Sequence, residues 1–99
     1  IAGTWNQVAY AEYRLTMTFV QANELDKALQ HAQIFTKLCQ ENKAEDRDMF
    51  YCYEALATVE RARRNDSGFA RAVEQATAYF EKLNAEHRAW CEADLKKIS

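Results

Sequence analysis

Two stretches of the chain share one pattern of apolar and small residues: LDKALQHAQIFTKL, residues 25–38, and FARAVEQATAYFEKL, residues 69–83. Leu25 corresponds to Phe69, and further matches follow at the same offset: Ala28 with Ala72, Leu29 with Val73, Ala32 with Ala76 and Phe35 with Tyr79. Apolar residues three or four positions apart share one face of an α-helix. A helical unit that recurs after roughly 30–50 residues is typical of an α-solenoid, in which stacked helical hairpins bury a continuous core.

The composition of the whole chain also favours helices. Of the 99 residues, 48% are hydrophobic and 28% are charged, which is close to the averages of globular proteins. Only 2 Gly and no Pro are present, too few turn-forming residues for a β-sandwich, a β-barrel or a Rossmann unit. With 13 Lys and Arg against 15 Asp and Glu, the net charge of −2 gives no sign of a nucleic-acid-binding protein. We therefore expect an all-α protein.

The apolar periodicity predicts five helices joined by short polar segments. Their expected ranges are 4–21, 24–40, 45–64, 67–83 and 85–97. The run from Asn65 to Gly68 is the strongest turn signal, and Asn84 is expected to cap the fifth helix. The alternative is one long helix that continues through Asn84.

The expected architecture is one domain, residues 1–99, built from two tandem antiparallel helical hairpins and a short C-terminal helix. The first hairpin would cover residues 4–42, the second 45–83, and the last helix 85–97. Ala28 and Ala32 lie one helical turn apart, which permits close approach of a neighbouring helix.

The apolar stripes predict which helix faces are buried. The third helix would bury Met49, Cys52, Tyr53, Leu56 and Val59, and the fifth would bury Trp90, Cys91 and Leu95. The first helix carries two stripes, Trp5–Val8–Leu15–Phe19 and Tyr10–Tyr13–Met17–Val20. A helix that is apolar on two sides either packs between two neighbours or presents one side to a partner.

No constellation of residues points to catalysis, to a cofactor or to a metal. Cys39, Cys52 and Cys91 are widely spaced, so we expect buried free thiols and not disulfides or a zinc site. We expect His31 and Glu12 at the margin of the core with their polar atoms hydrogen-bonded. The alternatives are a ligand or metal role for His31 and a pocket-lining role for Glu12. The prediction is a protein that is not an enzyme and holds no cofactor.

The positions Leu15, Phe19, Leu25 and Ala28 resemble the apolar, aromatic, large and small positions of the tetratricopeptide repeat, a family of helical hairpins. In the second hairpin Val59, Phe69 and Ala72 hold these positions, and Arg63 stands where an aromatic residue is usual. The chain departs from the family at the early Trp, replaced by Glu12 and Leu56, and at the small Gly, replaced by Thr16 and Glu60. The segments YEALATVERAR from Tyr53 and AEHRAWCEADLKKI from Ala85 are similar to the ends of uncharacterised bacterial proteins of this type.

The resemblance also implies a groove that binds a partner. In tetratricopeptide repeats the first helix of each hairpin lines the concave face, which places Tyr10, Tyr13, Met17 and Gln21 in the groove. The third helix would add Glu54, Ala57, Arg61 and Arg64. Tyr and Arg are enriched at protein interfaces, whereas a solvated face is usually rich in Lys and Glu. The alternative is that Tyr10 and Tyr13 pack on the third helix of the same domain.

These features predict a helical scaffold that binds a protein or peptide, or a second copy of itself as a homodimer. The alternative is a small-molecule sensor with a pocket between the first and third helices, formed by Tyr13, His31, Tyr53 and Glu54. We expect no nucleic acid as a partner, because the net charge is only −2. We also expect no membrane as a partner, because no apolar run approaches the ~18 residues that span a bilayer. The absence of a disulfide framework among the three cysteines predicts a reduced, cytoplasmic protein, and no stretch is typical of a signal peptide. Since the first residue is Ile1 and not Met, we expect a fragment or a chain that lacks its first residues.

Overall fold

The computed structural model describes residues 4–99, which form five α-helices and no strand. The helices are α1 (Trp5–Gln21), α2 (Leu25–Glu41), α3 (Asp46–Ala62), α4 (Asp66–Glu81) and α5 (Ala85–Ile98). Each begins and ends within two residues of the range predicted from the sequence. The predicted break before α5 is confirmed, because the Asn84 side chain accepts a hydrogen bond of 2.8 Å from the backbone N–H of His87.

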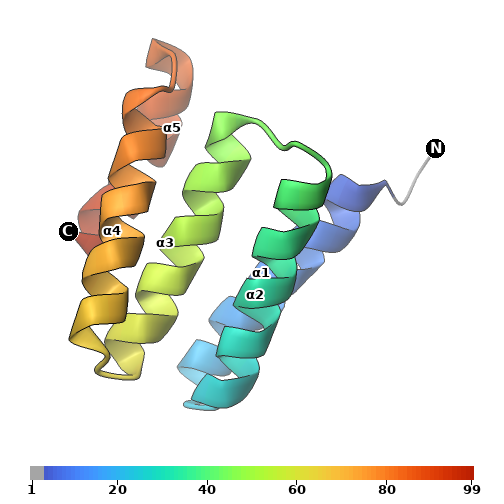
Figure 1. The fold of residues 1–99 in the computed structure, drawn as a ribbon, viewed down its shortest axis with the longest axis vertical. Coiled ribbons are helices and arrows are strands. Elements are labelled where there is room, and N and C mark those ends of the chain that lie inside the picture. The colour runs from blue at the N-terminus through green and yellow to red at the C-terminus, as the bar shows by residue number, and fades with distance from the viewer. Residues whose placement is uncertain (1–3) are drawn as a thin grey trace.

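The central helix of the molecule is α3, which contacts all four others (Figure 1). The pair formed by α1 and α2 lies on one side of α3, and α4 with α5 lies on the other. In Figure 1, α2 and α4 are nearer the viewer, whereas α1 and α5 lie behind them. One helix therefore joins the two halves of the fold.

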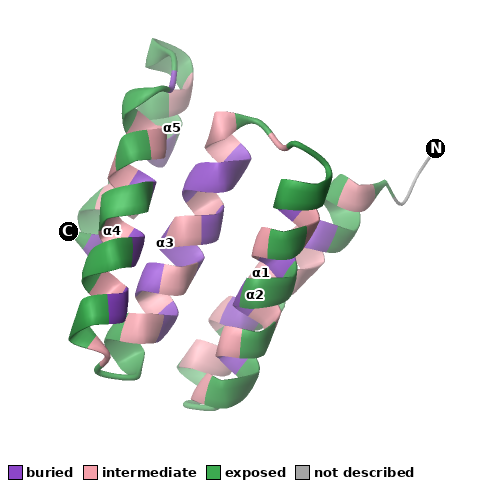
Figure 2. Ribbon diagram, in the orientation of Figure 1, coloured by how far each residue is buried: buried purple, intermediate pink, exposed green. Residues whose placement is uncertain are grey.

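Burial is concentrated on α3, as Figure 2 shows. Of its predicted inward residues, Met49, Cys52 and Val59 are buried, while Tyr53 and Leu56 are half-buried. Five further residues of α3 are buried that the apolar stripe did not predict: Asp48, Phe50, Glu54, Ala55 and Ala57. A helix with neighbours on several sides buries more than one stripe, and this explains the difference.

The three turns before α2, α3 and α4 have the same backbone conformation. In each turn one residue is left-handed: Asn23 with φ 58°, Lys43 with φ 50° and Arg64 with φ 60°. The N–H of the following residue then donates to a carbonyl in the last turn of the preceding helix, at 2.8 to 3.0 Å. This arrangement satisfies carbonyls that a helix end otherwise leaves without a partner.

Alanines allow α2 and α4 to pack closely against α3. Ala28 and Ala32 of α2 are buried and pack with Val59 of α3. Ala72 and Ala76 of α4 are buried in the cluster that contains Phe50 and Ala57 of α3. The burial of these four alanines confirms the inward face predicted from the repeated stretches.

The prediction for α5 was wrong at Trp90, of which 65% is exposed. Cys91 is buried and Leu95 is half-buried, as expected, but the second fully buried residue is Ile98, beyond the predicted end of the helix. Cys91 and Ile98 are two turns apart and form the inward face. Trp90, one residue before Cys91, points about 100° away from that face.

In α1 the buried residues are Ala9 and Thr16, which lie between the two apolar stripes. One stripe is partly open to solvent, because Val8 is 49% and Leu15 is 38% exposed. The residues of the other stripe, Tyr10, Tyr13, Met17 and Val20, are all half-buried.

We predict that Ala28→Leu lowers the free energy of unfolding by about 1–3 kcal/mol, because the added atoms have no space between α2 and α3. The control is Ala70→Leu, at an exposed position of α4, which should change stability little. Urea denaturation of both variants measures the difference. Equal stability of the two variants would mean that the helices are not closely packed at Ala28.

Candidate functional site

Three tyrosine hydroxyls connect the odd-numbered helices, which lie side by side. The pairs are Tyr10 with Asp48 at 2.6 Å, Tyr13 with Glu54 at 2.8 Å, and Tyr51 with Asp94 at 2.8 Å. In every pair the tyrosine donates to a carboxylate of the next odd-numbered helix, from α1 to α3 or from α3 to α5. We call these contacts the tyrosine–carboxylate pairs.

The rings of the α1 tyrosines are half-buried against α2 and α3. Tyr10 and Tyr13 both contact Phe35 of α2, with ring centroids 5.1 and 5.5 Å apart. Tyr13 also meets the edge of Tyr51 of α3, at 5.8 Å. The alternative raised by the sequence is therefore the arrangement found, since both tyrosines pack on α3 of the same chain.

The tyrosines of the three pairs remain protonated donors. Burial raises the pKa of Tyr10, Tyr13 and Tyr51 well above the ordinary value, and the carboxylate that each one faces raises it further. These hydroxyls therefore donate over the whole physiological pH range.

Glu54, the carboxylate that accepts from Tyr13, is almost completely buried, with only 4% of the residue exposed. Burial raises the pKa of its carboxyl to about 7, and the nearby Asp94 adds to the rise. The Tyr13 hydroxyl opposes this shift, since its hydrogen bond favours the charged form. At neutral pH the carboxyl is therefore close to half-protonated, and it is not accessible to a partner.

A hollow of about 290 Å³ lies across α1, α3 and α5 and is lined by Tyr10, Arg47, Tyr51 and Trp90. We call it the aromatic groove. Its three aromatic residues each occupy the sixth position of their helix. The Arg47 guanidinium lies 5.0 Å from the centroid of the Trp90 ring and 3.8 Å from the Asp48 carboxylate. Stacking on Trp90 favours this position of the cation.

The other residues predicted to bind a partner are dispersed. Arg61 donates to the Lys97 carbonyl at 2.7 Å and lies over the Phe69 ring, so it connects α3 to α5 and α4. Arg64 is the exposed left-handed residue of a turn, and Gln21 is the exposed last residue of α1. Met17 is half-buried and Ala57 is fully buried.

Of the residues that line the aromatic groove, only Tyr10 was predicted, and Arg47, Tyr51 and Trp90 were missed. Trp90 was predicted to be buried because it was grouped with Cys91 and Leu95 in one apolar stripe of the fifth helix. The groove could have been predicted from the positions of aromatic residues within the helices. An aromatic residue five places after the first helical residue recurs in α1, α3 and α5.

Of the four residues suggested for a sensor pocket, only Tyr13 and Glu54 are hydrogen-bonded to each other. His31 contacts the Glu12 carboxylate and stacks on Phe19, at the core margin as expected. Tyr13 and Glu54 bind each other, and Tyr53 stacks on Tyr79 instead. The predicted burial of the three free cysteines is confirmed.

Among residues 4–99, no group of three or more His, Cys, Asp and Glu side chains is placed to hold a metal ion. None of the described helices has the length and apolar character needed to cross a bilayer. No protein-family model, curated protein or solved structure matches the chain. The function is therefore inferred from the geometry of the molecule.

We predict that Glu54 makes the protein less stable as the pH rises. Its pKa is about 7 in the folded protein against 4.5 ordinarily, so the folded state binds more protons between these values. The contribution of Glu54 to stability is fully present below pH 4.5. The free energy of unfolding falls by about 3 kcal/mol as the pH rises from there to above 7. Glu54→Gln retains an acceptor for Tyr13 but cannot ionise, so its stability should fall less between about pH 5 and pH 8.

Urea denaturation across this pH range measures the effect. The control is Glu92→Gln, at an exposed position of α5, which should keep the wild-type pH dependence. The same loss of stability with pH in Glu54→Gln and wild type would show that Glu54 titrates as an ordinary surface carboxyl.

Proposed function

We propose that the chain is a tetratricopeptide-repeat-like scaffold that binds a peptide segment of a protein partner in the aromatic groove. The observation that carries this proposal is Trp90, which is 65% exposed beside Tyr10 and Tyr51 and is faced by the Arg47 guanidinium. Trp, Tyr and Arg are the residue types that contribute most to binding at protein interfaces. A cluster of all three around one hollow favours a binding surface over a solvated face.

The repeat-like part of the proposal is supported by the recurrence of local structure. The turns that follow α1 and α3 each contain one left-handed residue, Asn23 and Arg64, and the same closing hydrogen bond, which the turn after α2 shares. Ala28 and Ala32 in α2 are buried as Ala72 and Ala76 are in α4. The first helices of successive hairpins, α1 and α3, lie side by side with α5 as the next member of the series.

The groove offers ring faces and guanidinium donors to a peptide. The hydroxyls of Tyr10 and Tyr51 are occupied by Asp48 and Asp94, so each ring is held in a fixed orientation. A large apolar or aromatic side chain fits against Trp90 and the two tyrosine rings. The Arg47 N–H groups can bind a peptide carbonyl or carboxylate beside that anchor. Because the tyrosine–carboxylate pairs fix the rings in advance, little ordering cost opposes binding.

We predict that Trp90→Ala weakens peptide binding at least tenfold while the helical circular dichroism stays unchanged, because the exposed ring contributes little to the fold. Peptides would be selected from a random library displayed on phage against the wild-type chain, and their dissociation constants measured by fluorescence anisotropy. The control is Ile34→Ala, which truncates an exposed apolar residue of α2 outside the groove. Failure to select any peptide, or equal affinity for the Trp90→Ala variant, would contradict the proposal.

A further inference from the structure

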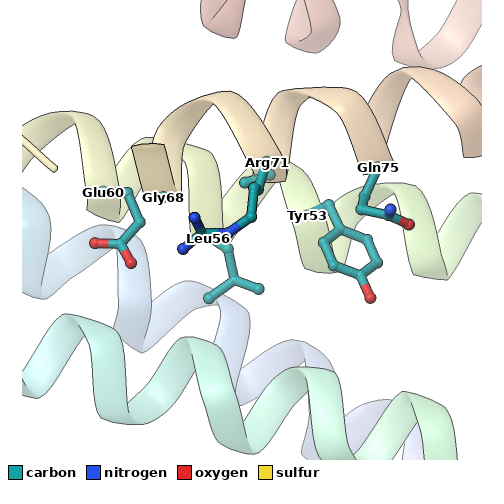
Figure 3. A pocket seen from close by; sticks show the side chains of 7 residues that line it. Tyr53, Leu56, Glu60, Gly68, Arg71 and Gln75 are labelled. Carbon is teal, nitrogen blue, oxygen red and sulfur yellow. The ribbon is translucent and has the colours of Figure 1, made fainter. Parts of the chain in front are cut away.

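A second hollow, of about 210 Å³, lies between α3 and α4 and shares no lining residue with the aromatic groove. Figure 3 shows this hollow, which we call the α3–α4 pocket. On α3 it begins at Tyr53, two residues after Tyr51 of the aromatic groove. Two residues correspond to about 200° around a helix, so the two hollows open on different sides of α3.

The floor of the α3–α4 pocket is apolar. Leu56 of α3 is half-buried and Ala72 of α4 is buried. Tyr53 forms one wall, and its ring stacks on Tyr79 with centroids 5.8 Å apart and planes 9° from parallel. This stacking holds the Tyr53 ring in place and leaves a flat surface against which the apolar body of a ligand can lie.

The pocket also holds an uncompensated positive charge. Arg71 is exposed and forms no hydrogen bond or ion pair with any other residue in the described part of the chain. The one carboxylate that lines the pocket, Glu60, binds Arg63 at 2.6 Å and forms no ion pair with Arg71. Figure 3 shows the residues that line this pocket, with Tyr53 and Leu56 on α3 and Arg71 and Gln75 on α4.

From these features we infer that the α3–α4 pocket binds a small free molecule with a carboxylate group and a flat apolar body. The carboxylate would take two parallel hydrogen bonds from Arg71, the geometry for which a guanidinium is suited. Gln75 supplies a further amide donor at the opening. The apolar body would lie on Leu56 and Ala72, against the Tyr53 ring. A volume of about 210 Å³ is below the roughly 300–1,000 Å³ of pockets for drug-sized ligands, so the acid that fits is a small one.

The test is a titration of the full chain, labelled with ¹⁵N, with phenylacetate as the probe, followed by NMR. We expect saturable shifts of backbone amides around Leu56 and Ala72 at millimolar concentrations. Phenethylamine carries the same ring with a positive charge and should not bind. Arg71→Gln should weaken phenylacetate binding about tenfold or more, because a charge-assisted hydrogen-bonded pair is lost. The matched control is Arg14→Gln, which removes an exposed arginine of α1 and should leave binding unchanged.

The inference would be overturned by the absence of a saturable shift with phenylacetate, by equal binding of phenethylamine, or by unchanged affinity in Arg71→Gln. Shifts confined to Arg47, Tyr51 and Trp90 would also overturn it, because the acid would then occupy the aromatic groove. Peptide binding to the Trp90→Ala variant is measured separately. The failure of either proposal therefore leaves the other intact.

Discussion

Two carboxylates, those of Asp48 and Glu54, are buried in the helix that contacts every other helix of the molecule. A buried carboxylate without a hydrogen-bond donor is strongly destabilising. Tyr10 and Tyr13 of α1 supply the donors. The position of α1 along the axis of α3 is therefore the one at which both hydroxyls reach their acceptors. Tyr51 and Asp94 fix α5 beside α3 in the same way. The relative position of the three odd-numbered helices thus follows from a small number of polar contacts.

This relative position produces the aromatic groove. The aromatic groove forms because the sixth residues of α1, α3 and α5 meet on one side of α3. The hydrogen bonds of Tyr10 and Tyr51 lie within the protein, so both rings are held in a fixed orientation. A different side of α3 forms the α3–α4 pocket with Arg71. One central helix therefore contributes to two separate hollows of different chemistry.

The features predicted well from the sequence are local ones. Apolar periodicity gave the helix ranges within two residues, and the recurring alanines identified the inward faces of α2 and α4. The left-handed residues Lys43 and Arg64 carried no signal, because glycine or asparagine usually occupies such positions. Glu54 and Trp90 were misplaced because the third and fifth helices were each assigned a single buried stripe. Burial of Glu54 depends on neighbours that are distant in sequence, and exposure of Trp90 depends on Cys91 and Ile98 forming the inward face of α5 instead.

The register of the odd-numbered helices is tested most directly by following the Glu54 side-chain carboxyl carbon by ¹³C NMR as a function of pH, in the wild type and in Tyr13→Phe. We predict a pKa of about 7 in the wild type, because the carboxyl is buried. In Tyr13→Phe the pKa should be higher, because the hydroxyl that stabilises the charged form is gone. A pKa near 4.5 that does not respond to Tyr13→Phe would show that Glu54 faces water and that α1 is not held against α3 in this way.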